Sequence, residues 1–166
     1  TAHHVLAHQR VDTVISALLR YEPDLGRVRG IGFCVSVRHA EFMAEKFNER
    51  GIRSAVLVGE TERGKREQLL QEFRGQQLTF LFTCDVLNEG LDIPEINTVL
   101  FLRPTESLTV FLQQLGRGLR HAPGKDSLTV LDFVGQAHRR YRIDRKLKGL
   151  FREFSGKSLV RTAGAA

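Results

Sequence analysis

The chain alternates short apolar runs with longer stretches in which apolar residues recur at helical spacing. Residues 31–37 form a continuous apolar run, as expected of a strand that is buried on both faces. Similar runs at 52–58, 78–84, 97–102 and 127–133 predict further strands. Each run is short and most are bounded by Gly, Pro or polar residues, which favours strands over helices.

Between these runs, the apolar spacing predicts helices. We expect one helix to end at Gly51, a residue suited to the left-handed position after a helix, and another to be capped by the hydroxyl of Thr61. The predicted helices are residues 5–21, the segment that carries Ala40, Met43, Ala44 and Phe47, the segment that carries Leu69, Leu70 and Phe73, residues 106–116, and a last helix that begins near Gln136 with Ile143, Leu147, Leu150 and Phe154 on one face.

Strands that alternate with helices at this spacing predict an α/β fold with a mainly parallel sheet and helices on both faces. We expect residues 1–166 to form one domain, with 1–27 as an N-terminal helical lead-in and 136–158 as a basic C-terminal helix. In such folds, ligands bind at the loops that follow the carboxyl ends of the strands. Polar clusters stand at three of those places: Gly59-Glu60-Thr61, Thr83-Cys84-Asp85 and Arg103-Pro104-Thr105.

Composition indicates one class of partner and argues against others. The formal net charge is +6, with 25 Lys and Arg against 19 Asp and Glu, which favours a polyanionic partner. No long apolar run or signal pattern is present, so we expect a cytoplasmic protein without membrane contact. Cys34 and Cys84 lie in apolar runs and are expected to be buried thiols, and the histidines lack metal-ligand spacing, so no metal site is predicted.

One polar pattern suggests chemistry. Gln113, Arg117 and Arg120 stand at i, i+4 and i+7, which places their side chains on one side of a helix. Glycines flank Arg117, so a ligand could approach closely, and Arg donates in a planar, bidentate geometry that suits phosphates. The alternative is a solvated, Arg-rich helix end, which the helix dipole also favours.

Two further basic features have simpler interpretations. Gly156-Lys157-Ser158 resembles the end of a phosphate-binding loop, but Phe151 stands where that motif needs Gly, so we reject it. Within 139–152, Arg and Lys are opposed only by Asp144; we interpret this run first as a solvated helix face and second as a patch that contacts backbone phosphates.

The sequence resembles a known family. The stretch from Thr83 to Pro94 is similar to helicase motif V, the stretch from Gln113 to Arg120 is similar to motif VI (Q-x-x-G-R-x-x-R), and Ser36–His39 stands at the place of motif IV. In this order they resemble the C-terminal RecA-like lobe of superfamily 2 helicases and translocases, over about residues 28–135. Glu89 stands where DEAD-box RNA helicases carry Arg, which favours a DNA enzyme.

The resemblance implies roles for single residues. Cys84 stands where many relatives have a hydroxyl residue, so that contact is either moved to Thr83 or absent. The implied roles are catalytic contact with the γ-phosphate for Arg117 and Arg120; nucleotide binding for Gln113, Gly90 and Asp92; and nucleic-acid binding for Ser36, Gly59, Arg66 and Thr83.

The same resemblance implies ATP and Mg²⁺ as cofactors, both held mainly by a first lobe. No phosphate loop is found in this sequence, so we expect that lobe elsewhere in the same polypeptide and expect the isolated chain to be inactive. The implied function is the second motor lobe of an ATP-dependent DNA helicase or translocase, with RNA not excluded as the partner. The alternative is a stand-alone RecA-like module that binds nucleic acid without catalysis.

Overall fold

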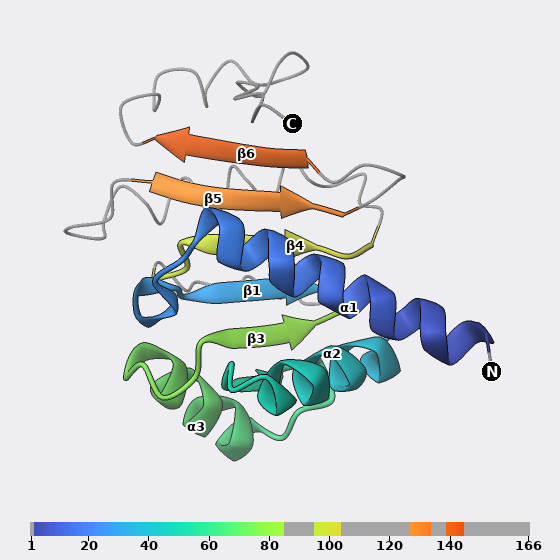
Figure 1. Ribbon diagram of the computed structural model, residues 1–166. Helices are drawn as coiled ribbons and strands as arrows, with labels where there is room; N and C mark the ends of the chain where they lie inside the picture. The colour runs from blue at the N-terminus through green and yellow to red at the C-terminus, as the bar shows by residue number, and fades with distance from the viewer. Residues whose placement is uncertain (1, 85–94, 104–126, 134–138, 145–166) are drawn as a thin grey trace, which may run out of the picture.

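The structure is a computed structural model that describes residues 2–84, 95–103, 127–133 and 139–144. From α1 to β3 the helices and strands alternate, as the sequence predicts (Figure 1). They are α1 (Ala2–Tyr21), the short 3-10 helix η1 (Leu25–Arg27), β1 (Gly30–Phe33), α2 (Val37–Glu49), β2 (Ser54–Val56), α3 (Arg63–Arg74), β3 (Phe80–Thr83), β4 (Thr98–Phe101), β5 (Ser127–Asp132) and β6 (Arg139–Asp144).

The strands form one six-stranded sheet in the order β2-β3-β1-β4-β5-β6. The first five strands are parallel, and β6 pairs with β5 in the antiparallel direction. Phe33 at the end of β1 lies opposite Thr83 on one side and Phe101 on the other. The carboxyl ends of the parallel strands therefore lie along one edge of the sheet, which we call the carboxyl edge. The predicted α/β class with a mainly parallel sheet is confirmed.

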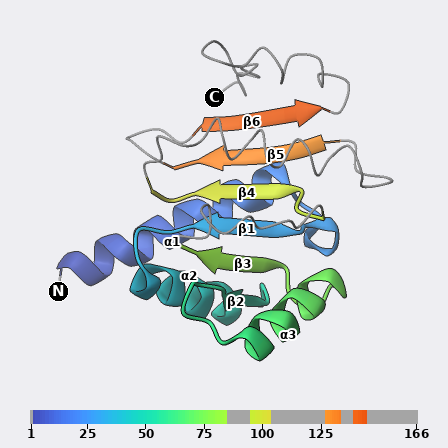
Figure 2. The same ribbon diagram turned by 180° about the vertical axis from the view of Figure 1, so that it is seen from behind.

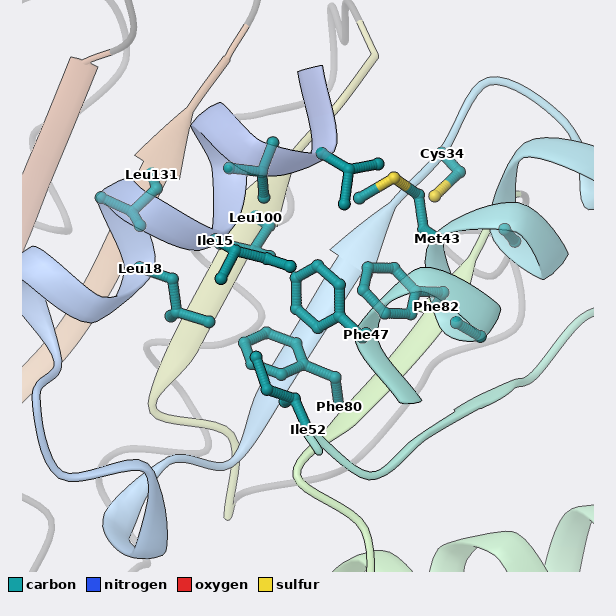
Figure 3. Close-up of a cluster of buried hydrophobic side chains, with 14 of the residues drawn as sticks. Ile15, Leu18, Cys34, Met43, Phe47, Ile52, Phe80, Phe82, Leu100 and Leu131 are labelled. Carbon is teal, nitrogen blue, oxygen red and sulfur yellow. The ribbon is translucent and has the colours of Figure 1, made fainter. Parts of the chain in front are cut away.

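Helices cover both faces of the sheet. α1 and α2 lie on one face, and α3 lies on the other (Figures 1 and 2). Beneath α1 and α2, a buried cluster includes Val14, Ile15, Leu18, Met43, Phe47, Phe80, Phe82, Leu100 and Leu131 (Figure 3). Beneath α3, a second cluster includes Ile31, Phe33, Leu69, Phe73, Leu81, Val99 and Phe101. Alternate residues of the central strands feed the two clusters, which is why these strands read as continuous apolar runs.

Aromatic packing fixes α2 on the sheet. The ring of Phe47 meets the rings of Phe80 and Phe82 edge-on, with centroid distances of 5.3 and 4.9 Å. Those two rings lie over Gly30 and Gly32 of β1, where an added Cβ would come within 2.0 Å of Phe80 and 2.5 Å of Phe82. The absence of side chains at these glycines gives the rings their place.

The ends of the helices partly follow the sequence. Gly51 has a φ of +76° just after α2, as predicted for the left-handed position. The prediction that Thr61 caps α3 is wrong, because the N-cap residue is Glu62 and the Thr61 hydroxyl instead accepts from the Val58 N–H at 3.0 Å. Of the helices described, none is long and apolar enough to span a membrane.

The C-terminal prediction is wrong in one segment. Residues 139–144 form the strand β6, whereas the expected basic helix covered 136–158. The local sequence Arg-Arg-Tyr-Arg-Ile-Asp has the alternation of a strand, and pairing along the whole of β5 gives it backbone hydrogen bonds on one side. Of the apolar stripe that suggested a helix, only Ile143 lies within the described residues.

Candidate functional site at the carboxyl edge

The parallel register brings together three of the predicted nucleic-acid contacts. Ser36 follows β1, Gly59 follows β2 and Thr83 ends β3, so all three lie at the carboxyl edge. Backbone hydrogen bonds extend the pairing just beyond the strands: Cys34 N–H donates to the Thr83 carbonyl at 2.7 Å, and Leu57 N–H donates to the Phe82 carbonyl at 2.9 Å. Backbone hydrogen bonds therefore hold the segments of this edge to one another, so they are not independent loops.

Ser36 begins α2 as its N-cap residue. Its extended backbone and exposed side chain place the hydroxyl where it accepts from the His39 N–H at 3.1 Å. This satisfies one of the backbone donors that a helix leaves unpaired at its first turn. Ser36 thus has a structural role in addition to the predicted contact with nucleic acid.

His39 completes this arrangement from the opposite direction. Its Nδ1 accepts from the Val35 N–H at 3.1 Å. The Ser36 side chain therefore bonds to the backbone of His39, while the His39 side chain bonds to the backbone of Val35, the residue before Ser36. Burial lowers the pKa of His39, and the nearby Arg10 of α1 lowers it further. The prediction made for the histidines, which concerns metal-ligand spacing alone, misses this contact. A signal is present in the sequence, because Ser-x-x-His has the spacing of a capping box with an imidazole in place of the usual carboxylate.

Arg66 lies in α3, half-buried, below the loop that carries Gly59. Its guanidinium donates to the Val58 carbonyl at 3.2 Å, and its backbone N–H donates to the Glu62 carbonyl at 2.8 Å. Gly59 itself is exposed. The geometry gives Arg66 a role in shaping the β2–α3 loop, and its predicted contact with nucleic acid remains a prediction.

The side chain of Thr83 is buried, whereas the prediction placed it in contact with nucleic acid. Its side chain is 0% exposed, and its hydroxyl has no hydrogen-bond partner among the described residues. Leu81 packs beneath α3, so strand alternation directs Thr83 to that same side. A side chain with no exposed surface cannot touch a nucleic-acid backbone in this conformation.

Cys84 does not share the environment of Thr83. It lies close enough to Cys34 to affect that thiol, which packs beneath α1 and α2. Burial raises the pKa of Cys34 to about 12, and the Cys84 thiol adds to the shift. Both cysteines are free and buried, as predicted. A hydroxyl contact at position 84 is therefore not replaced by one at Thr83.

Arg103 is a further polar residue of this edge. Its guanidinium donates to the Cys84 carbonyl at 2.8 Å, although Arg103 follows β4 and Cys84 follows β3, with β1 between them. The arginine thus spans the end of β1 and holds a backbone carbonyl near the start of the motif V-like segment. Its position in the Arg-Pro-Thr cluster was the only sequence signal for it.

The electrostatics of the edge favour anions. α2 and α3 both begin here, neither has an acidic residue in its first turn, and the positive ends of their dipoles lie at the edge. Arg38, Arg63 and Lys65 are exposed in these first turns. Glu60 and Glu62, also exposed, oppose this charge on the β2–α3 loop. The β1–α2 loop is therefore the more favourable of the two for a phosphate.

The predicted nucleotide contacts lie outside the described residues. They are Gly90, Asp92, Gln113, Arg117 and Arg120. Within the part of the chain that is described, no group of three or more His, Cys, Asp or Glu side chains is arranged to hold a metal ion.

The fold and this edge define a class, and comparison with known families agrees with it. The model of the helicase conserved C-terminal domain matches residues 10–122, and the chain belongs to that family. It is a C-terminal RecA-like lobe of the superfamily 2 helicase type. The matched range includes every site residue predicted from the sequence.

Among curated proteins, the chain is similar to two yeast helicases. It is 40% identical over 119 residues to a putative mitochondrial ATP-dependent helicase, irc3, of Schizosaccharomyces pombe, covering 71% of this chain and 20% of that protein. It is 32% identical over 103 residues to the putative ATP-dependent helicase IRC3 of Saccharomyces cerevisiae, covering 62% of this chain and 15% of that protein. The chain therefore spans about a fifth or less of the length of these relatives.

Solved structures agree on the fold. The helicase domain of Hef from Pyrococcus furiosus superposes with a TM-score of 0.55 at 24% identity, covering 79% of this chain and 26% of that one. The C-terminal part of the Fun30 ATPase domain gives 0.61 at 11% identity, covering 90% of this chain and 46% of that one.

Proposed function

We propose that this chain is the second motor lobe of an ATP-dependent superfamily 2 DNA helicase or translocase. ATP and Mg²⁺ are held mainly by a first lobe of the same polypeptide, and this lobe closes on them. Its motif VI-like arginines reach the γ-phosphate, and its carboxyl edge grips the nucleic-acid backbone. Closure then moves the grip relative to the first lobe, which converts hydrolysis into movement along a strand.

The observation that carries the proposal is the assembly of the carboxyl edge. Three segments far apart in sequence, after β1, β2 and β3, meet there with two helix N-termini and exposed basic side chains. Such a surface suits phosphates spaced along a strand and does not depend on base identity. The family match and the names of the relatives, both called ATP-dependent helicases, support the motor assignment.

The test is the ATPase rate of the full-length protein with single-stranded DNA, duplex DNA and RNA. We expect DNA to stimulate hydrolysis more than RNA does. Binding to single-stranded DNA should be independent of sequence and weaken steeply with salt, by about 0.7 in the log–log slope for each phosphate contacted. Hydrolysis that no nucleic acid stimulates, or a strong base preference, would contradict the proposal.

A further inference from the structure

The β1–α2 loop is held by few contacts of its own. Val35 is 65% exposed and Ser36 is exposed, so packing contributes little to the shape of this turn. The Ser36 carbonyl accepts from the Ala40 N–H at 3.0 Å, and the turn is otherwise held by the reciprocal pair of hydrogen bonds with His39, each at 3.1 Å. Both lie within normal hydrogen-bond distance. The His39 ring accepts the one from the Val35 N–H, the His39 backbone N–H donates the other, and the residue is half-buried, which restrains the ring.

We propose that His39 is a positioning residue for nucleic-acid binding. Its neutral imidazole holds the Val35–Ser36 turn in the shape that contacts the backbone of the bound nucleic acid. This rests on the proposed function, because the turn matters only if the carboxyl edge grips nucleic acid. His39 acts through the turn and is not itself the contact. Its role makes the grip of this lobe depend on the protonation of one side chain.

The chemistry of imidazole determines whether nucleic-acid binding strengthens or weakens as the pH falls. A neutral ring can accept at Nδ1, whereas the protonated ring donates at both nitrogens and accepts at neither. Protonation therefore removes the bond from the Val35 N–H. Acid should loosen the turn and weaken binding. A histidine that touched phosphate directly would behave in the opposite way, because its positive charge would strengthen the contact.

The surroundings keep the ring neutral near pH 7. Arg10 of α1 faces it with a positive charge, and burial and this charge both lower the pKa of His39. The sheet contributes the Cys34 and Cys84 thiols at the ends of β1 and β3; both are buried, and the pKa of Cys34 is raised to about 12. On α2 itself, the adjacent charged residues are Arg38 and Glu41, both exposed. Only an acidic pH therefore charges this ring.

The experiment compares the full-length wild type with His39→Asn and His39→Ala. The Asn side-chain oxygen stands close to the position of Nδ1 and can accept, but it does not titrate. At constant ionic strength, we expect the affinity of wild type for a poly-dT oligonucleotide, relative to that of His39→Asn, to fall as the pH is lowered from 8 through the pKa of His39, by about fivefold once the ring is charged. His39→Ala should bind about fivefold more weakly than wild type at pH 8 and show no further relative loss at pH 5.5.

Amide hydrogen exchange separates the possible failures. In His39→Ala the Val35 amide should exchange faster than in wild type, while His39→Asn keeps its protection. If Val35 exchanges faster but affinity at pH 8 is unchanged, or if wild type binds more tightly in acid than His39→Asn, the positioning role is wrong and the proposed function stands. If no variant binds single-stranded DNA at either pH, the proposed function itself is wrong and the inference falls with it.

Discussion

Gly30 and Gly32 show how single residues place the sheet beneath α2. An added Cβ would come within 2.0 Å of the Phe80 ring at Gly30 and within 2.5 Å of the Phe82 ring at Gly32. The rings cannot retreat easily, because Phe47 packs edge-on against both. Gly32→Ala should therefore lower the free energy of unfolding by about 1–3 kcal/mol, measured by urea denaturation.

Gly64 provides the matched control for that change. It lies exposed in α3, and an added Cβ there would meet nothing within 4 Å. Gly64→Ala should leave stability unchanged or raise it by up to about 1 kcal/mol, because Ala favours the helix. Equal losses at both positions would show that the rings do not depend on the space over β1.

Two buried threonines differ in one respect that a valine substitution can measure. The Thr83 hydroxyl has no partner among the described residues, whereas the Thr129 hydroxyl donates to Glu22 Oε1 at 2.6 Å. Thr83→Val should be neutral or stabilising by about 1 kcal/mol, and Thr129→Val should cost about 1–3 kcal/mol. Thermal unfolding of both variants gives the comparison; a large loss at Thr83 alone would reveal a hidden partner. DNA affinity should not change in Thr83→Val.

At the scale of the elements, the sequence predicts most of the fold but not every boundary. The buried central strands were predictable because residues such as Ile31 and Leu81 feed one core while Phe80 and Phe82 feed the other. β6 was not, because its apolar residues also fit a helical stripe and only pairing with β5 decides between the two. The predicted cap of α3 is wrong for a local reason, because the Thr61 hydroxyl accepts a hydrogen bond from the Val58 N–H instead.

The location of the site could be predicted from the sequence, but the contacts of its side chains could not. That Ser36, Gly59 and Thr83 share one edge follows from parallel strands, whose ends must coincide. The burial of Thr83 depends on tertiary packing that no spacing rule contains. The bond between Val35 and His39 is local and follows the Ser-x-x-His spacing, but only the structure shows that the imidazole accepts from Val35. Arg103 reaches across β1 to Cys84, a contact between segments that are 19 residues apart.

The two roles of Ser36 can be separated through α2. Its hydroxyl caps the helix by accepting from the His39 N–H, and Asp can make the same contact. Ser36→Ala should lower stability by about 1 kcal/mol. Ser36→Asp should keep stability but weaken binding to single-stranded DNA, because its charge repels phosphates. Equal DNA affinity for Ser36→Asp and wild type, measured by fluorescence anisotropy, would remove Ser36 from the proposed interface.

At the scale of the whole molecule, the proposal makes this lobe, with its net charge of +6, one wall of a cleft that a first lobe would complete. In the proposed motor, ATP rests on a first lobe, and this lobe contributes most where charge develops during phosphoryl transfer. In the proposed motor, that contribution comes from Arg120, with Arg117 beside it. Both lie outside the described residues, so their role stands on the motif VI-like spacing alone.

The most direct test of the central claim is therefore the kcat for ATP hydrolysis by full-length Arg120→Ala, with DNA present. Arginine fingers in other phosphoryl-transfer enzymes contribute about 10³–10⁵ in rate, whereas a surface ion pair is worth at most about 1 kcal/mol, or about fivefold. We predict a fall of at least about a hundredfold, with ATP affinity and thermal stability little changed, and no rescue by Arg120→Lys, whose point charge lacks the two-pronged geometry. A kcat close to that of wild type in a stably folded Arg120→Ala protein would contradict the account.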